Sequence, residues 1–107
     1  MAAFHILSLS GGGYKGLYTA KVLAKIEEQF GCPIARKFDL IAGTSIGGIL
    51  AISLALEIPV SEMVKLFVKN GEQIFSPNIF SLMGLCKSKY SNAGLKDILE
   101  KMCRFSN

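Results

Sequence analysis

The residues best suited to do chemistry are a serine and the small residues around it, in the segment Gly43-Thr44-Ser45-Ile46-Gly47. This G-x-S-x-G pattern is typical of a nucleophile elbow, in which the serine occupies a strained turn between a strand and a helix and its neighbours must be small. The helix that follows would place positive potential beside the serine oxygen and the carbonyl that it attacks. We therefore predict that Ser45 is the nucleophile of an acyl-transfer reaction. The alternative is a glycine-rich turn whose serine only caps the helix.

A serine hydroxyl needs a neighbouring base to become a good nucleophile. The usual Ser-Asp-His order on such an elbow requires a histidine that follows the serine in the chain. The sequence holds one histidine, His5, and it precedes Ser45 inside the first expected strand. An ordinary triad is therefore excluded within these residues, and we expect His5 to be a strand-edge or core residue.

A second glycine-rich segment, residues 11–16 with the sequence G-G-G-Y-K-G, falls between an expected strand and an expected helix. Its pattern matches the G-x-G-x-x-G of a dinucleotide loop. That loop needs an acidic residue at the end of the second strand, whereas Asp39 lies at its start. Glycines would equally let backbone N–H groups approach a developing oxyanion. An oxyanion hole, a nucleotide loop and a plain tight turn all remain open at this point.

Composition limits the chain to one globular domain without an evident nucleic-acid or metal site. It has 107 residues, of which 50% are hydrophobic and 19% charged, and a net charge of +4 from scattered basic residues. Neither basic blocks nor interleaved aromatic residues suggest nucleic-acid binding. The three cysteines form no CxxC pair, and one histidine cannot complete a zinc set. No secretory signal is visible and the longest apolar stretch is too short for a bilayer, so we expect a cytoplasmic protein.

The elements that must position these segments follow from hydrophobic periodicity and turn residues. The expected strands are residues 4–9 and 38–42, and the expected helices are residues 14–30, 45–56, 60–68 and 92–103. Gly31 is the expected C-cap of the first helix, and Asn92 the expected N-cap of the last. Short strands that alternate with helices favour a parallel α/β sheet. Two strands cannot complete such a sheet, so another part of the protein or another chain must extend it.

Together, the two glycine motifs resemble those of the patatin-like phospholipase family. That family pairs a G-G-G-x-[RK]-G oxyanion loop with a G-x-S-x-G elbow, and Lys15 and Gly16 stand in the matching loop positions. The resemblance implies a three-layer α/β/α sandwich around a parallel sheet, incomplete in this chain, with residues 1–107 as the N-terminal part of a single domain. It implies an oxyanion hole made by backbone groups of the glycine loop and of the residue after the serine. These residues are Gly11, Gly12, Gly13 and Ile46.

The chain departs from the family at two places. Ser10 stands where many members have an acidic residue, and the Asp-Gly motif that carries the dyad aspartate does not occur. Asp39 and Asp97 both lack the context of that motif. The resemblance therefore implies a Ser-Asp dyad whose aspartate lies outside this chain, so these 107 residues alone are expected to be inactive.

The implied function of the whole protein is hydrolysis of an acyl ester of a phospholipid or related lipid, without a cofactor or metal ion. Peripheral membrane contact follows from that substrate, and apolar residues in the expected loop 73–90 could line an acyl channel or touch the membrane. These residues are Phe75, Ile79, Phe80, Leu82, Met83 and Leu85. A second copy or a complementing chain is left open as a partner. Two other functions stay open, a catalytically inactive regulatory module and a nucleotide-binding α/β protein.

Overall fold

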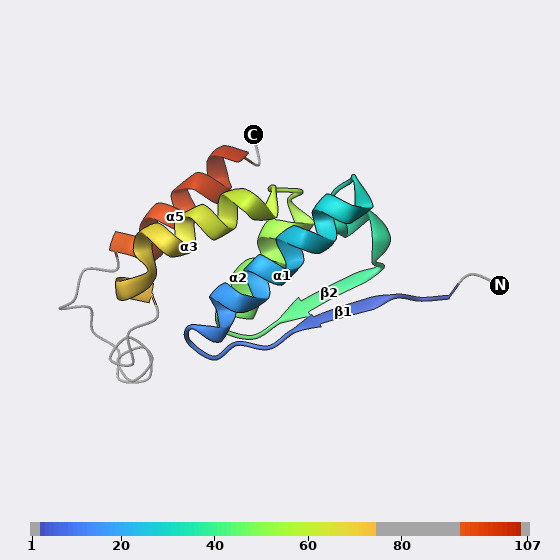
Figure 1. Cartoon of the computed structure of the whole chain (residues 1–107), viewed down its shortest axis with the longest axis horizontal. Helices are drawn as coiled ribbons and strands as arrows, with labels where there is room; N and C mark the ends of the chain where they lie inside the picture. The colour runs from blue at the N-terminus through green and yellow to red at the C-terminus, as the bar shows by residue number, and fades with distance from the viewer. Residues whose placement is uncertain (1–2, 75–92, 106–107) are drawn as a thin grey trace.

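The computed structural model describes residues 3–74 and 93–105 (Figure 1). Two strands and two helices alternate along the first half of the chain, and further helices follow, as predicted. The elements are β1 (Ile6–Leu9), α1 (Lys15–Phe30), the 3₁₀ helix η1 (Ile34–Lys37), β2 (Leu40–Gly43), α2 (Ile46–Ala55), α3 (Val60–Ile74) and α5 (Ala93–Phe105). The predicted N-cap at Asn92 and the apolar residues between 75 and 85 lie outside the described residues.

The strands β1 and β2 pair in parallel, which confirms the predicted sheet type. Ile6 lies opposite Leu40 and Leu9 lies opposite Gly43, so both strands end at the same edge of the sheet. The glycine loop follows β1 and the serine segment follows β2, and the register therefore brings the two motifs together. In open α/β sheets this carboxyl edge is where ligands bind.

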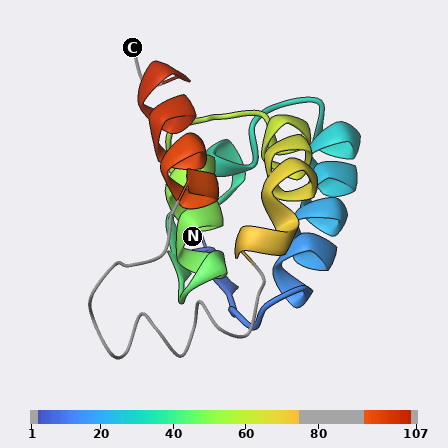
Figure 2. The same cartoon turned by 90° about the vertical axis from the view of Figure 1, so that its left-hand side faces the viewer.

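One face of the sheet is covered and the other is bare in the described part of the chain. Leu7 and Ile41 pack toward the core, whereas Ile6 and Leu40 are 57% and 48% exposed on the opposite face. Strand side chains alternate between faces, so these positions mark the two surfaces of the sheet. The helices lie on one side of the strands (Figure 1, Figure 2). The fold is α/β, and it supplies the sheet and one helical layer of a three-layer sandwich.

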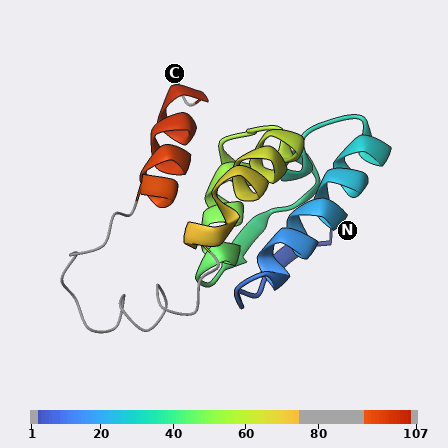
Figure 3. The ribbon, with the colours of Figure 1, turned by 60° about the vertical axis from the view of Figure 1, so that its left-hand side comes forward.

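The core forms where α2 lies between the sheet and the outer helices. Leu50, Leu54 and Ser53 of α2 are fully buried, and Met63 and Phe67 of α3 pack against the same cluster. The helix α3 lies beside α1 (Figure 2, Figure 3) and also contacts α5. The prediction that the second helix is mostly buried is confirmed.

Helical periodicity predicts that Phe30 and Val68 lie on the apolar faces of the expected helices 14–30 and 60–68, but both residues are exposed. Phe30 ends α1 beyond the region where it meets α3, and its ring lies 5.8 Å from the ammonium group of Lys37. Val68 lies on the flank of α3, because the buried positions of this helix run through Met63, Phe67 and Gly71. The expectation was wrong for both, since periodicity shows an apolar face but not how wide or how long the partner surface is. The helix η1 was not predicted, because four residues are too few to show a period.

Glu27 joins three elements of the fold through its carboxylate. Oε2 accepts a hydrogen bond from the backbone N–H of Ile34 at 3.3 Å, and Oε1 accepts one from Val60 at 3.0 Å. Ile34 and Val60 begin η1 and α3, where N–H groups have no partner within their own helix. One side chain of α1 therefore satisfies the starts of two other helices.

Glu27→Ala is expected to lower the free energy of unfolding by about 2 kcal/mol, because two backbone donors lose a charged acceptor. Urea denaturation of the whole protein measures this loss. The matched control is Glu28→Ala, since Glu28 is exposed and only pairs with Lys25 at 4.0 Å. That control is expected to cost less than about 0.5 kcal/mol. Equal losses in the two variants would show that Glu27 does not bridge the helices.

An ion pair makes a second link, between η1 and the turn after α2. Arg36 donates from Nε to Oε1 of Glu57 at 3.1 Å and from Nη2 to Oε2 at 3.2 Å. These hydrogen bonds hold the pKa of Glu57 below its ordinary value. Glu57 also has a φ of 58°, which residues other than glycine seldom adopt. The two hydrogen bonds from Arg36 fix the orientation of the Glu57 side chain in this turn.

Candidate active site

Ser45 occupies a sharp turn between β2 and α2. Its φ is 57° and its ψ is −128°, and its side chain makes no capping hydrogen bond to α2. A non-glycine residue in such a region stores about 1–3 kcal/mol of strain, and strain of this kind gathers at functional sites. Ser45 thus occupies the N-cap position of α2, but its hydroxyl does not cap the helix, so helix capping alone does not account for a serine here. Its side chain is exposed at the carboxyl edge of the sheet, where a substrate can reach it.

The glycines on both sides of Ser45 are required by close backbone contacts. A Cβ atom on Gly43 would collide with the carbonyl group of Gly47, the second residue of α2. A Cβ atom on Gly47 would collide with the carbonyl group of Leu9 at the end of β1. Both positions therefore need glycine for space, as the sequence pattern predicted.

The glycine loop lies directly against this turn. The backbone N–H of Gly11 donates to Thr44 Oγ1 at 3.4 Å, and a Cβ atom on Gly11 would stand 2.7 Å from the Cβ of Ser45. Gly12 and Gly13 have φ values of 135° and 60°, which fold the loop back toward the start of α1. This contact with Ser45 favours the oxyanion-hole interpretation over a nucleotide loop or a plain turn.

The glycine loop and the start of α2 both contain backbone donors without a protein acceptor among the described residues. Within residues 3–74 and 93–105, the N–H groups of Gly12, Gly13 and Ile46 donate to no protein acceptor. Ile46 is the first residue of α2, so its N–H points out of the helix N-terminus, where anions bind favourably. The N–H of Gly11 differs, because Thr44 already accepts it. Three of the four predicted oxyanion residues therefore present an available donor.

The two other motif residues of the loop lie at the start of α1. The N–H of Lys15 donates to Gly12 O at 3.2 Å, and that of Gly16 donates to Gly13 O at 2.9 Å. Gly16 is buried, whereas the side chain of Lys15 is exposed and passes beside Gly12. These bonds attach the loop to a regular helix on its C-terminal side.

Neither His5 nor Asp39 can act as the base for Ser45. Asp39 accepts a hydrogen bond at Oδ2 from the backbone N–H of His5 at 2.7 Å, and both residues are exposed. They flank the starts of β2 and β1, at the opposite end of the sheet from Ser45. A four-residue strand alone separates the ends by about 13 Å. His5 is exposed and lies directly before β1. It is therefore not a core residue, although it does lie next to the strand, as expected.

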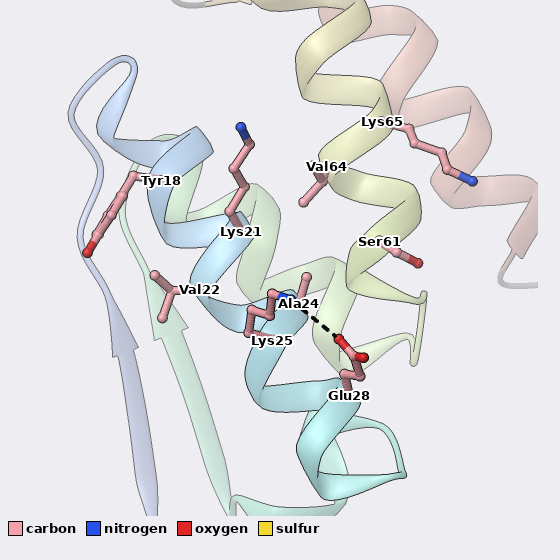
Figure 4. A pocket seen from close by; sticks show the side chains of 9 residues that line it. All are labelled: Tyr18, Lys21, Val22, Ala24, Lys25, Glu28, Ser61, Val64 and Lys65. Atoms are coloured by element: carbon pink, nitrogen blue, oxygen red, sulfur yellow. Dashed lines mark ion pairs between the residues drawn. The ribbon is translucent and has the colours of Figure 1, made fainter.

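A groove between α1 and α3 is separate from this site (Figure 4). Its floor is apolar and its rim carries lysines, with Lys25 paired to Glu28. Its lining residues are Tyr18, Lys21, Val22, Ala24, Lys25, Glu28, Ser61, Val64 and Lys65. None belongs to either glycine motif, so the groove does not hold the scissile bond next to Ser45.

A parallel α/β sheet with a strained serine at its carboxyl edge and an adjoining glycine loop is the arrangement found in α/β serine hydrolases. Comparison with known proteins narrows the class. The family described as patatin-like phospholipase matches residues 7–106, and the chain belongs to this family.

Three relatives show the range of the similarity. The cGAMP-activated phospholipase of Pseudomonas aeruginosa is 52% identical over 99 residues, which cover 90% of this chain and 30% of that protein. The cUMP-AMP-activated phospholipase of Escherichia coli is 35% identical over 88% of this chain and 31% of its own length. The human calcium-independent phospholipase A2-gamma is 38% identical over 82% of this chain and 11% of its own length. No solved structure matches the chain.

The chain thus spans about 30% of the length of its bacterial relatives. In the part of the chain that the structure describes, no helix is both long and apolar enough to cross a bilayer.

Proposed function

We propose that the whole protein is a serine acyl hydrolase that cleaves an ester bond of a membrane phospholipid, with Ser45 as the nucleophile. The carrying observation is the strained, exposed Ser45 beside three available backbone donors, those of Gly12, Gly13 and Ile46. The phospholipase relatives support the substrate class. We propose further that residues 1–107 are the N-terminal part of one catalytic domain, and that the remainder of the domain supplies an aspartate as the base.

In the proposed mechanism, the aspartate takes the proton of Ser45 while Oγ attacks the ester carbonyl. The carbonyl oxygen becomes an oxyanion, and the N–H groups of Gly12, Gly13 and Ile46 stabilise it. Collapse of the tetrahedral intermediate breaks the ester bond, and the aspartate returns the proton to the leaving lysophospholipid alcohol. Water, deprotonated by the same aspartate, then attacks the acyl-enzyme, and the aspartate returns this proton to Ser45 Oγ as the fatty acid leaves. Gly11 does not donate to the oxyanion in this scheme, because its N–H is bonded to Thr44; it contributes by holding the glycine loop in place.

Cyclic nucleotides enter the proposal as activators. Two relatives are described as activated by cGAMP and by cUMP-AMP, and the first is 52% identical to this chain. We propose that a cyclic dinucleotide activates this protein too, and that it acts in the cytoplasm at the membrane surface. Assays without nucleotide would then underestimate the activity, so each assay is made with and without cGAMP and cUMP-AMP.

Covalent labelling by a fluorophosphonate tests the proposed nucleophile. We expect labelling of the whole protein at Ser45, because the reagent mimics the tetrahedral intermediate at an activated serine. The tryptic peptide of residues 38–65 contains three serines, Ser45, Ser53 and Ser61, so fragmentation must assign the site. Ser53 is buried and bonded to the carbonyls of α2, and Ser61 is exposed on α3. A folded whole protein that stays unlabelled with either nucleotide would overturn the proposal and favour an inactive regulatory module.

A further inference from the structure

Thr44 contacts all three segments that meet at the candidate site. Its backbone N–H donates to Leu9 O at 3.1 Å, at the end of β1, and its carbonyl accepts from Gly47 N at 2.9 Å, in α2. Its side-chain Oγ1 accepts the N–H of Gly11 at 3.4 Å, in the glycine loop. Any residue could form the first two bonds. The third requires a side-chain acceptor on the β-carbon.

We propose that Thr44 is a positioning residue for the oxyanion hole, an inference that rests on the proposed function. Its hydroxyl holds the N–H of Gly11, and this bond fixes the N-terminal side of the loop beside Ser45. Gly12 and Gly13 follow Gly11 directly, and their N–H groups are then held toward the oxygen of the substrate's ester carbonyl. Thr44 touches no reacting atom and acts through Gly11.

The loop needs such an anchor because its residues have the greatest backbone freedom. Three consecutive glycines lack the side chains that restrict φ and ψ, and they lose the most entropy when they are ordered. On the C-terminal side, the bonds from Lys15 to Gly12 and from Gly16 to Gly13 hold the loop to α1. On the N-terminal side, in the described chain, the bond from Gly11 to Thr44 is the one that joins loop and elbow.

A purely structural role would have a different signature. Thr44 is exposed, so loss of its hydroxyl removes no core contact and is expected to change stability little. A displaced oxyanion donor acts on the transition state, because the oxyanion forms only there. A small shift of a catalytic group can lower the rate by about a hundredfold. The effect of Thr44 should therefore fall on kcat, with little change in KM.

Thr44→Val and Thr44→Ser separate the hydroxyl from the shape of the side chain. Val keeps the branched shape without an acceptor, and we expect kcat to fall about tenfold or more while KM stays within about twofold. Ser keeps the acceptor, and we expect kcat within about threefold of the wild type. Affinity for a trifluoromethyl ketone, which forms a tetrahedral adduct with the serine, should fall in parallel with kcat in the Val variant. Thr19→Val is the matched control, since the Thr19 hydroxyl bonds to the carbonyl of Lys15 within α1.

The outcomes distinguish this inference from the proposed function. A wild-type protein that neither hydrolyses phospholipid nor binds the ketone would overturn the proposed function itself. An active wild type with an unchanged Thr44→Val variant would overturn the positioning role alone. Equal losses in Thr44→Val and Thr44→Ser, or a loss confined to KM, would also overturn it. A lowered kcat with rescue by serine and an unchanged melting temperature supports it.

Discussion

Ser45→Ala is expected to lower phospholipid turnover by the whole protein about 10⁴-fold or more. Loss of the nucleophile removes the covalent pathway, and the oxyanion donors alone give only weak residual catalysis. Release of fatty acid from phospholipid vesicles, with cGAMP or cUMP-AMP present, measures the change. Ser61→Ala is the control, since Ser61 is an exposed serine of α3 outside both glycine motifs. Retained turnover in Ser45→Ala would mean that another residue forms the acyl-enzyme.

A second substitution of Ser45 tests the backbone strain at this position separately from its proposed role as the nucleophile. Glycine accepts a φ of 57° and a ψ of −128° readily, so Ser45→Gly should relieve strain that Ser45→Ala retains. We expect the glycine variant to be about 1 kcal/mol more stable than the alanine variant, although both are inactive. Urea denaturation of the two variants measures the difference. Equal stabilities would show that the backbone of Ser45 is relaxed.

Gly47→Ala is expected to lower the free energy of unfolding by about 3 kcal/mol and to abolish most activity. The added Cβ collides with the carbonyl of Leu9, which is backbone and cannot rotate away. Either β1 or α2 must shift, and overpacking of this kind is costly. Because Leu9 leads into the glycine loop, the shift is also expected to move the proposed oxyanion donors away from Ser45. Urea denaturation and vesicle hydrolysis of the whole protein measure the two effects.

Gly31→Ala is the matched control for this substitution. Gly31 caps α1 with a φ of 66°, and an added Cβ there meets nothing within 4 Å. Its cost is the left-handed backbone alone, about 1 kcal/mol, and activity should be retained. Both variants exchange glycine for alanine, so the difference between them measures the collision. Similar losses in both would show that the chain relieves the collision at Gly47 at little cost, and that Gly47 is not required for space.

Local patterns in the sequence predicted the features that depend on nearby residues. Gly31 was predicted to cap the first helix, and its N–H does bond to Glu27 O at 3.1 Å in the left-handed conformation. The small residues at 43 and 47 were predicted from the sharpness of the turn. The parallel sheet followed from the alternation of strands and helices. In each case a few neighbouring residues determine the geometry, so spacing and residue type are enough.

Features that join distant parts of the chain could not be predicted in this way. Glu27 bonds to Val60, 33 residues away, and Gly11 bonds to Thr44, also 33 residues away. Neither pair leaves a periodic or compositional signal. Both depend on the register of β1 with β2 and on how α1 lies beside α3. The predicted burial of Phe30 and Val68 failed because the extent of the partner surface, both along a helix and around it, is also set by the tertiary structure.

The sequence by itself determined the family, the α/β class and the serine and glycine segments that could do chemistry, since these depend on residue type and local spacing. Only the tertiary structure decided that the hydroxyl of Ser45 makes no capping bond to α2 and that its φ is positive, because the φ comes from the path of the chain from β2 into α2. It also decided which glycine donors are available, because Thr44 accepts the N–H of Gly11 and leaves those of Gly12 and Gly13. The hydrogen bonds at this site join segments that are distant in the sequence, and only folding brings these segments together.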